Sequence, residues 1–203
     1  MEKLTSFVQL CQNVKKRCNS SDSISLILIG GCSRTGKTTL AENIKRELTK
    51  DNIHSLVVHS DHWIVSLEKR QPDSKVLERF ECAEIEKAIT LLLNKNKIFP
   101  PVYDPISRKR ISENSNHYFY LENGVLIVEG VIVLALKNLF EKSSYNIYIE
   151  INDEKRTQRL YDFYRNIKKL SEKQTLSIIS SRENEEVLFI KELSKNADCI
   201  YYS

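Results

Sequence analysis

Residues 31–38 carry the strongest chemical signal in this chain of 203 residues. Their sequence, GCSRTGKT, fits the spacing G-x4-G-K-[ST], in which backbone N–H groups surround a polyphosphate at the start of a helix. The Lys37 ammonium would bind the terminal phosphates, and the Thr38 hydroxyl would complete a Mg²⁺ coordination shell. The loop predicts binding of ATP, with GTP as the alternative. The nucleotide-binding residues expected here are Gly31, Cys32, Ser33, Arg34, Thr35, Gly36, Lys37, Thr38 and Thr39.

Two carboxylates follow apolar runs at positions from which they could reach a bound phosphate. Asp61 comes directly after HSLVVHS (54–60), and Glu129 lies at the end of VLIVEG (125–130). Because the carboxyl ends of neighbouring parallel strands share one crevice, Asp61 could accept a hydroxyl proton there. Glu129 could hold Mg²⁺ through water or support Asp61. The alternatives are a helix N-cap for Asp61 and an ion pair with Lys37 for Glu129.

Basic side chains occur in two further segments that could face a ligand. FPPVYDPISRKR (99–110) combines three prolines with three cations and predicts a stiff surface loop over a ligand pocket, with a solvated basic turn as the alternative. Arg156, Arg159 and Arg165 lie on or just after a helix expected near 152–169. They could close over a phosphoryl group and neutralise developing charge. The alternative is a solvated helix face whose arginines pair with acidic residues of the same helix.

Elements of two kinds must position these residues. Continuous apolar runs predict buried strands, and apolar positions at helical spacing predict amphipathic helices. Their alternation predicts an α/β fold with an open, doubly wound, five-stranded parallel sheet. The expected strands are 24–30, 54–60, 125–130, 145–151 and 198–203, and the expected helices are 1–20, 37–50, 81–97, 152–169 and 182–196.

Composition limits the class of protein. With 41% hydrophobic and 29% charged residues, the chain is expected to form a single domain over 1–203. A net charge of +4 with both signs interspersed gives no support for nucleic acid as a partner. We also expect no membrane partner, because no apolar run approaches the ~18 residues that a spanning helix needs. Five scattered cysteines predict reduced thiols and a cytoplasmic location. A small-molecule substrate is the expected partner, and a homo-oligomer stays open.

Taken together, these stretches resemble the uridine kinase and phosphoribulokinase-like family of P-loop kinases. The resemblance covers most of the chain after residue 24, and it is carried by GGCSRTGKTTLA, HSDHW, PVYDPISRKR, LIVEGVIVL, the basic helix after INDEKR, and KNADCIYY. It implies a sheet of the P-loop kinase type with a helical lid over about 153–182. It also implies transfer of the γ-phosphate of ATP, with Mg²⁺, to a primary hydroxyl of a nucleoside such as uridine or cytidine.

The resemblance also implies roles for individual residues. Asp61 would be the base, Tyr103 would lie beside the nucleobase, and Glu81 falls where the family usually has an aspartate that binds ribose hydroxyls. The catalytic residues implied are Lys37, Asp61, Arg159 and Arg165. The substrate-binding residues implied are Asp61, Trp63, Glu81, Tyr103, Arg108 and Arg156. The metal ligands implied are Thr38 and Glu129.

The sequence departs from the family's pattern on the acceptor side. Arg108 stands where uridine–cytidine kinases carry a histidine that reads the base edge, Arg34 stands where a small residue is usual, and Trp63 lies where a phenylalanine or tyrosine is common. These changes favour another acceptor as the alternative, such as nicotinamide riboside, pantothenate or a sugar phosphate. A regulatory nucleotide-binding protein is a further alternative, although NKNK (94–97) lacks the aspartate of a guanine-binding NKxD motif. We expect 166–182 to move on substrate binding.

Overall fold

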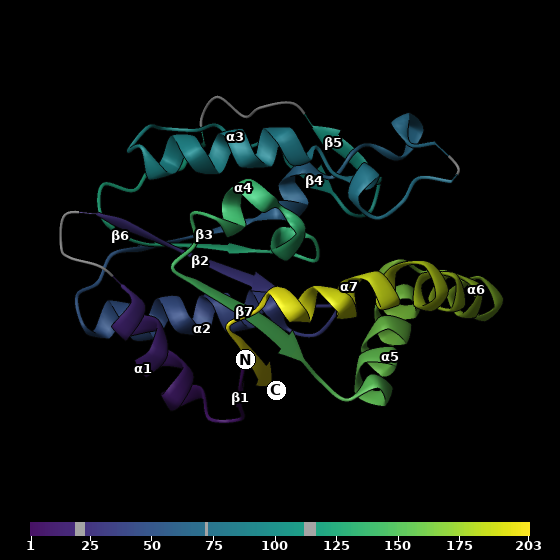
Figure 1. Ribbon diagram of the computed structural model, residues 1–203. Helices are drawn as coiled ribbons and strands as arrows, with labels where there is room; N and C mark the ends of the chain where they lie inside the picture. Colours follow the sequence, from purple (N-terminus) through teal and green to yellow (C-terminus); the bar gives the residue numbers. More distant parts are fainter. Residues whose placement is uncertain (19–22, 72, 112–116) are drawn as a thin grey trace.

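A parallel sheet lies at the centre of the computed structural model, which describes residues 1–18, 23–71, 73–111 and 117–203 (Figure 1). In this described part the sheet has six strands in the order β1-β8-β7-β2-β6-β3. Its strands are β1 (Glu2–Leu4), β2 (Ile24–Gly30), β3 (Ser55–His59), β6 (Gly124–Glu129), β7 (Tyr145–Glu150) and β8 (Cys199–Tyr202). The predicted doubly wound α/β fold is confirmed.

The additional strand, β1, corrects two expectations about the first twenty residues. Glu2 pairs with Cys199 at the edge of the sheet, so the sheet gains a sixth strand where five were predicted. The N-terminal helix begins at Phe7 rather than at the start of the chain, as α1 (Phe7–Arg17). The Ser6 hydroxyl caps the N-terminus of this helix by accepting the N–H of Gln9 at 3.3 Å. This cap fixes where the helix begins, and the residues before it are extended.

Helices cover both faces of the sheet because successive strand residues point to opposite sides. Leu26 and Leu28 of β2 pack on the face of α3 (Cys82–Leu93), α4 (Lys137–Phe140) and α7 (Leu188–Glu192). Ile27 and Ile29 pack on the opposite face with α1 and α2 (Lys37–Lys50). Figure 1 shows these two helical layers above and below the strands. This burial on both faces explains why the strand sequences are continuous apolar runs.

Between β3 and α3 the chain forms short 3-10 turns at Ser60–Trp63, Leu67–Lys69 and Leu77–Arg79. The segment predicted to be a stiff loop is instead a hairpin of β4 (Val102–Asp104) and β5 (Lys109–Ile111). Its turn is held by the Asp104 carboxylate, which accepts the N–H groups of Ile106 and Ser107, each at 2.9 Å. An aspartate that accepts backbone N–H groups two and three residues ahead favours a tight turn. Asp104 holds this position in the sequence YDPIS.

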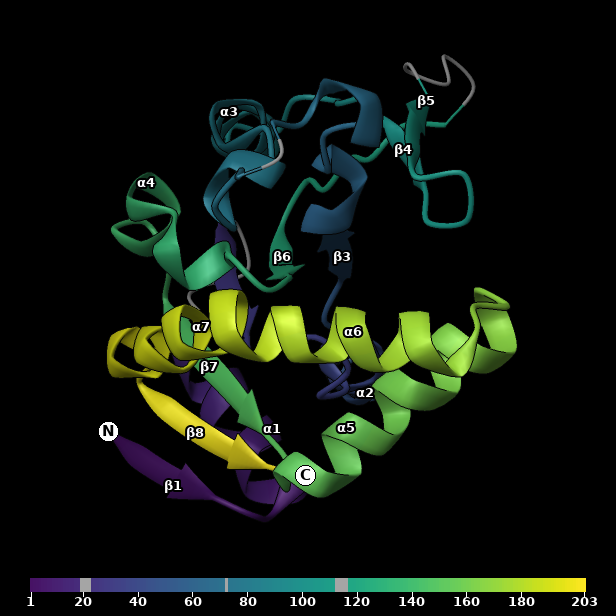
Figure 2. The same ribbon diagram turned by 90° about the vertical axis from the view of Figure 1, so that its right-hand side faces the viewer.

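The helical segment predicted over about 153–182 is present and projects from one end of the sheet (Figure 1), and α6 crosses the view from that end (Figure 2). It contains α5 (Asp153–Asp162), a π-helical turn at Phe163–Ile167 and α6 (Glu172–Arg182). A second π-helical turn, Glu183–Val187, leads into α7, and a 3-10 turn at Leu193–Asn196 leads to β8. Leu160, Tyr164 and Ile179 form a small core of their own. We call 153–187 the lid.

Among the described residues, no helix combines the length and the apolar character that crossing a bilayer requires. All five cysteines are free thiols.

Candidate active site

The loop between β2 and α2 has the geometry of a phosphate-binding turn. Gly36 lies at the start of α2 with φ of +102°, a left-handed conformation that glycine adopts without a steric penalty. The Lys37 ammonium donates to the Cys32 carbonyl at 2.8 Å, which fixes the lysine over the loop. Among the described residues, no protein acceptor pairs with the backbone N–H groups of Lys37, Thr38 and Thr39. These donors at the helix N-terminus fit an anionic polyphosphate.

Glu129 organises the floor of this site. Its Oε1 accepts the Thr38 hydroxyl at 2.8 Å and lies 2.7 Å from Nδ1 of His59, which is its partner residue on the neighbouring strand β3. Burial opposes ionisation of Glu129, but the bonds from His59 and Thr38 and the charge of Lys37 outweigh it, so its pKa lies below the usual value. The Glu129 carboxylate is therefore ionised at neutral pH. In turn, its hydrogen bond raises the pKa of His59.

Asp61 lies in the turn Ser60–Trp63 directly after β3, at the same edge of the parallel sheet as the loop that follows β2. Part of its side chain reaches solvent. Surrounding protein nevertheless removes much of its hydration, and this desolvation, with repulsion from Glu129, raises the pKa of its carboxyl. The charges of Lys37 and His59 lower the same pKa. The charged groups of Glu129, Lys37 and His59 therefore all lie near Asp61. A carboxylate with a raised pKa is suited to accepting a proton.

The charges of Glu129 and Asp61 also act on Lys37. Its side chain is only 8% exposed, and burial lowers its pKa, while Glu129 and Asp61 favour the charged form. The structure thus brings together the loop, Asp61 and Glu129, as the sequence predicted. The roles assigned to them stay predictions.

The lid contacts the loop through its cationic side chains. The Arg34 guanidinium stacks 3.6 Å from the ring centroid of Phe163, and Arg159 Nη1 donates to the Arg34 carbonyl at 3.3 Å. Arg34 has φ of +67°, so this loop residue is held in a conformation that a non-glycine residue rarely adopts. A small pocket between the loop and the lid is lined in part by Cys32 and Arg182. Arg34, which stands where the family usually has a small residue, is therefore a loop residue that contacts the lid.

Three of the predicted site residues form packing or polar contacts within the protein, and the roles predicted for them stay predictions. Trp63 is 3% exposed and packs in the core with residues of α3. Arg165 donates to the Leu170 carbonyl at 2.6 Å and stabilises the turn between the two long helices of the lid. Arg156 is 3% exposed and forms ion pairs with Glu183 and Asp153, and it also lines the small pocket between the loop and the lid. Its guanidinium thus ties α5 to the second π-helical turn.

The remaining predicted substrate residues belong to the hairpin or lie just before α3. The Tyr103 hydroxyl accepts Arg70 Nη2 at 3.1 Å. Glu81 precedes α3 and its Oε1 lies 3.8 Å from Arg110 Nη1. Arg108 is exposed in the hairpin turn, with φ of +59°. The strand β4 packs beside the turn Ser60–Trp63, so the hairpin borders Asp61.

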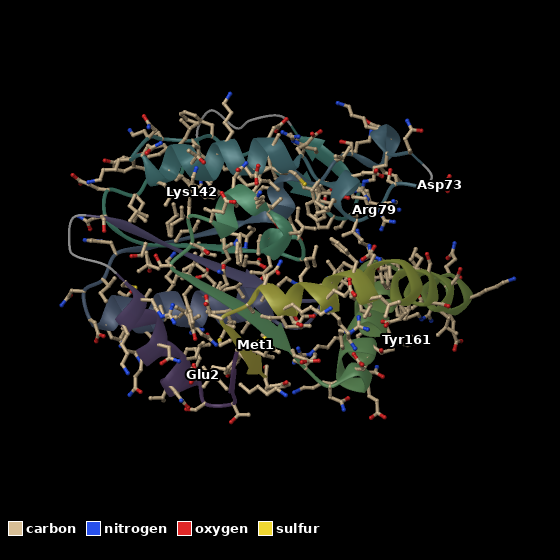
Figure 3. The ribbon with its side chains drawn as sticks, viewed as in Figure 1. Met1, Glu2, Asp73, Arg79, Lys142 and Tyr161 are labelled. Carbon is tan, nitrogen blue, oxygen red and sulfur yellow. The ribbon has the colours of Figure 1, made fainter. Side chains whose placement is uncertain are left out.

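Sequence reasoning missed two contributors. It assigned no role to His59, although His59 and Glu129 end neighbouring strands and therefore pair in register. It also missed Arg79, which forms an ion pair with Glu186 of the lid and points toward it (Figure 3). The role of His59 could have been found from the sequence, because His59 and Glu129 are polar residues at the ends of two predicted strands. The ion pair of Arg79 joins residues far apart in the chain, which no local pattern reveals.

The donor set also suits Mg²⁺. Hydroxyl and carboxylate oxygens are its preferred protein ligands, and Mg²⁺ in phosphoryl-transfer sites takes few of them because substrate phosphates supply the rest. Thr38 Oγ1 and Glu129 Oε1 lie together at 2.8 Å at the start of α2. Within the described ranges no three His, Cys, Asp or Glu side chains gather into an all-protein metal site.

Comparisons with known proteins agree with this geometry. A family model described as an AAA domain matches residues 27–188. A uridine kinase from Lactobacillus johnsonii is 27% identical over 135 residues, which cover 64% of this chain and 62% of that protein. A uridine kinase from Mycoplasma genitalium is 27% identical over 185 residues, covering 86% and 83%. The match thus spans less than two thirds of the first relative's length.

Solved structures share the fold. A candidate fructose transport system kinase from Silicibacter sp. TM1040 has a TM-score of 0.81 at 18% identity, covering 98% of this chain and 100% of that one. A structure described as a possible uridine kinase from Bacillus stearothermophilus has a TM-score of 0.64 at 21% identity, covering 96% of each chain. At these identities the likeness concerns the fold, which is that of P-loop kinases. The resemblance drawn from the sequence is confirmed.

Proposed function

Because this chain belongs to the AAA domain family and has the fold of P-loop kinases, we propose that it is an ATP-dependent small-molecule kinase. It transfers the γ-phosphate to a primary hydroxyl of a nucleoside or a related ribosyl compound. The observation that carries the proposal is the convergence of Asp61, Lys37 and Glu129 beside the phosphate loop. A regulatory nucleotide-binding protein has no need of a carboxylate placed there to accept a proton.

Each residue has a defined task in this reaction. The acceptor hydroxyl oxygen forms a bond to the γ-phosphorus as the bond from phosphorus to the leaving ADP oxygen breaks, and the hydroxyl proton passes to the Asp61 carboxylate. Lys37 and the N–H groups at the start of α2 hold the phosphates. Thr38 and Glu129 would hold Mg²⁺, which neutralises phosphate charge when it is bound. Arg159, above the loop carbonyl of Arg34, would neutralise charge on the transferred group.

The acceptor is the finer part of the proposal. Relatives named uridine kinase support a nucleoside such as uridine or cytidine. The exposed Arg108 in the hairpin favours the alternative of another ribosyl or vitamin-type acceptor, because guanidinium donates hydrogen bonds but accepts none.

The test is transfer of label from γ-labelled ATP, with Mg²⁺, to a panel of nucleosides, nicotinamide riboside, pantothenate and sugar phosphates. We expect one acceptor class to become labelled with the purified chain, and Asp61→Asn to remove that labelling. Asp162→Asn is the matched control, because Asp162 is an exposed aspartate of α5 whose carboxylate, among the described residues, accepts a side-chain hydrogen bond from its helix neighbour Gln158 alone. Slow release of inorganic phosphate with every acceptor unlabelled would contradict the proposal.

A further inference from the structure

Three cationic side chains from the hairpin side and the lid lie close enough to one another for their charges to interact. They are Arg70, Arg108 and Lys168, which we call the acceptor-side basic cluster. Arg70 follows the turn Leu67–Lys69, Arg108 lies in the hairpin turn, and Lys168 follows the π-helical turn of the lid. Within the described ranges, none of the three forms an ion pair with a carboxylate.

Backbone contacts fix the two arginines relative to each other. The Leu67 N–H donates to the Arg108 carbonyl at 3.0 Å, and the Arg110 N–H donates to the Ser66 hydroxyl at 2.8 Å. These bonds dock the hairpin turn onto the segment that carries Arg70. The Arg70 guanidinium is itself oriented, since Nε donates to the Val65 carbonyl at 2.8 Å and Nη2 to the Tyr103 hydroxyl at 3.1 Å.

The lid supplies the third charge from the opposite side. Lys168 Nζ lies 5.7 Å from the ring centroid of Phe163, which also carries the stacked Arg34 of the phosphate loop. Partial burial lowers the pKa of Lys168, and the charges of Arg108, Arg182 and Arg34 lower it further. Figure 2 shows the hairpin above the lid at one end of the molecule.

Repulsion within this cluster is only weakly offset by the protein. Burial lowers the pKa of Arg70, and so does the charge of Arg108. Asp104 is the acidic group that favours the charged form of Lys168, but its carboxylate already accepts two backbone N–H groups of the hairpin turn. Positive groups gathered in this way form a site for an oxyanion, because guanidinium binds phosphate and carboxylate through paired N–H groups.

We propose that the acceptor carries an oxyanion, a phosphate monoester or a carboxylate, which binds among Arg70, Arg108 and Lys168 while its primary hydroxyl faces Asp61. This inference rests on the proposed kinase function and narrows its acceptor class. The cluster borders Asp61 through β4, which packs beside the turn Ser60–Trp63. It is separate from the groups that hold the nucleotide phosphates, because Arg70 and Arg108 come from the hairpin side of the site.

The first test uses matched acceptors that differ by one anionic group, each assayed with Mg²⁺ and ATP. The pairs are ribulose and ribulose 5-phosphate, pantothenol and pantothenate, and uridine and uridine 3′-phosphate. We expect the anionic member of at least one pair to be phosphorylated with a higher kcat/KM, and the pair shows whether phosphate or carboxylate is recognised. Equal or better use of the neutral members would overturn the inference and leave the kinase function standing. Labelling of no acceptor at all would overturn both.

The second test changes the cluster itself. Arg108→Asn removes the charge with a residue that tolerates the left-handed backbone at this position, and Lys109→Asn is the matched control on the next residue, whose side chain is 63% exposed. We expect Arg108→Asn to lower kcat/KM for the anionic acceptor about 10- to 100-fold, as the loss of a charge-assisted contact predicts. The KM for ATP should stay near the wild-type value.

A binding measurement completes the test without turnover. Calorimetric titration of inorganic phosphate into the protein saturated with a non-hydrolysable ATP analogue should show a site that Arg108→Asn and Lys168→Gln each weaken and Lys109→Asn does not. Equal weakening by Lys109→Asn, or phosphate binding that none of the three variants changes, would contradict an oxyanion site in this cluster.

Discussion

The contact between the ends of β3 and β6 can be tested by adding a single methyl group. A Cβ placed on Gly130 would lie 1.8 Å from Ser60 Oγ and 2.9 Å from Ser60 Cβ. Gly130 follows the metal-site residue Glu129, and Ser60 precedes the proposed base Asp61. Gly130→Ala therefore pushes directly on the turn that positions the base, while the backbone at Gly130 itself needs no unusual φ.

The expected size follows from these distances. Ser60 is fully buried, so its side chain has no solvent into which it can swing, and the backbone must shift. Overpacking of this kind costs about 2 kcal/mol, which for a domain of this size lowers Tm by roughly 4–8 °C. A shift of the base by about 1 Å can cost on the order of 100-fold in rate. We expect kcat/KM to fall more than stability alone explains.

The assay is a double-mutant cycle with Ser60→Gly, which removes both atoms that the new methyl group meets. Among the described residues the Ser60 hydroxyl has no hydrogen-bond partner, so its removal breaks no bond. The double variant should recover most of the stability and activity that Gly130→Ala loses, which gives a coupling energy well above the value of about 0.5 kcal/mol found for independent sites. Thermal unfolding and kcat/KM are measured for all four proteins. Additive effects, or a fully active and stable Gly130→Ala, would refute the contact.

Further predictions concern the metal, the lid and pH. Thr38→Val removes the hydroxyl proposed to bind Mg²⁺ and should raise the Mg²⁺ concentration for half-maximal activity by roughly 10-fold or more, whereas Thr49→Val at the other end of α2 should not. Glu186→Gln breaks the ion pair with Arg79 and should speed proteolysis of the lid about fivefold, an opening easier by about 1 kcal/mol; the charge-swapped pair should restore protection. The raised pKa of Asp61 means that the folded state binds a proton more readily than the unfolded chain, so its ionisation opposes folding as pH rises through that pKa. Asp61→Asn should therefore raise Tm at pH 7 and not at a pH below both pKa values, where the carboxyl is neutral in either state.

Local sequence patterns predicted the sheet, the phosphate loop and the two carboxylates for a physical reason. A strand buried on both faces must be apolar throughout, so β2 and β6 stand out, and the polar residues at their ends are then few. Glu129 at the end of β6 was found in this way, and Asp61 was found because it follows the apolar run of β3. The strand β1 escaped because it has only three residues, and its pairing with β8 depends on a contact almost two hundred residues away.

Side-chain partners were beyond the reach of the same patterns. Trp63 is next to site residues in sequence, yet its ring is buried in the core, because burial removes a large apolar surface from water. Arg156 and Arg165 were predicted from charge, but charge alone does not tell a ligand contact from an ion pair or a capped carbonyl. Arg70 gave no signal because its position depends on how the hairpin docks.

The central claim is that Asp61 accepts the hydroxyl proton beside a phosphate held by the loop, and Asp61→Asn in single-turnover kinetics tests it most directly. With the acceptor found by labelling, the account predicts a rate of phosphoryl transfer lower by about 100- to 10,000-fold and an unchanged Kd for ATP. Transfer at the wild-type rate, with ATP bound as tightly, would contradict it.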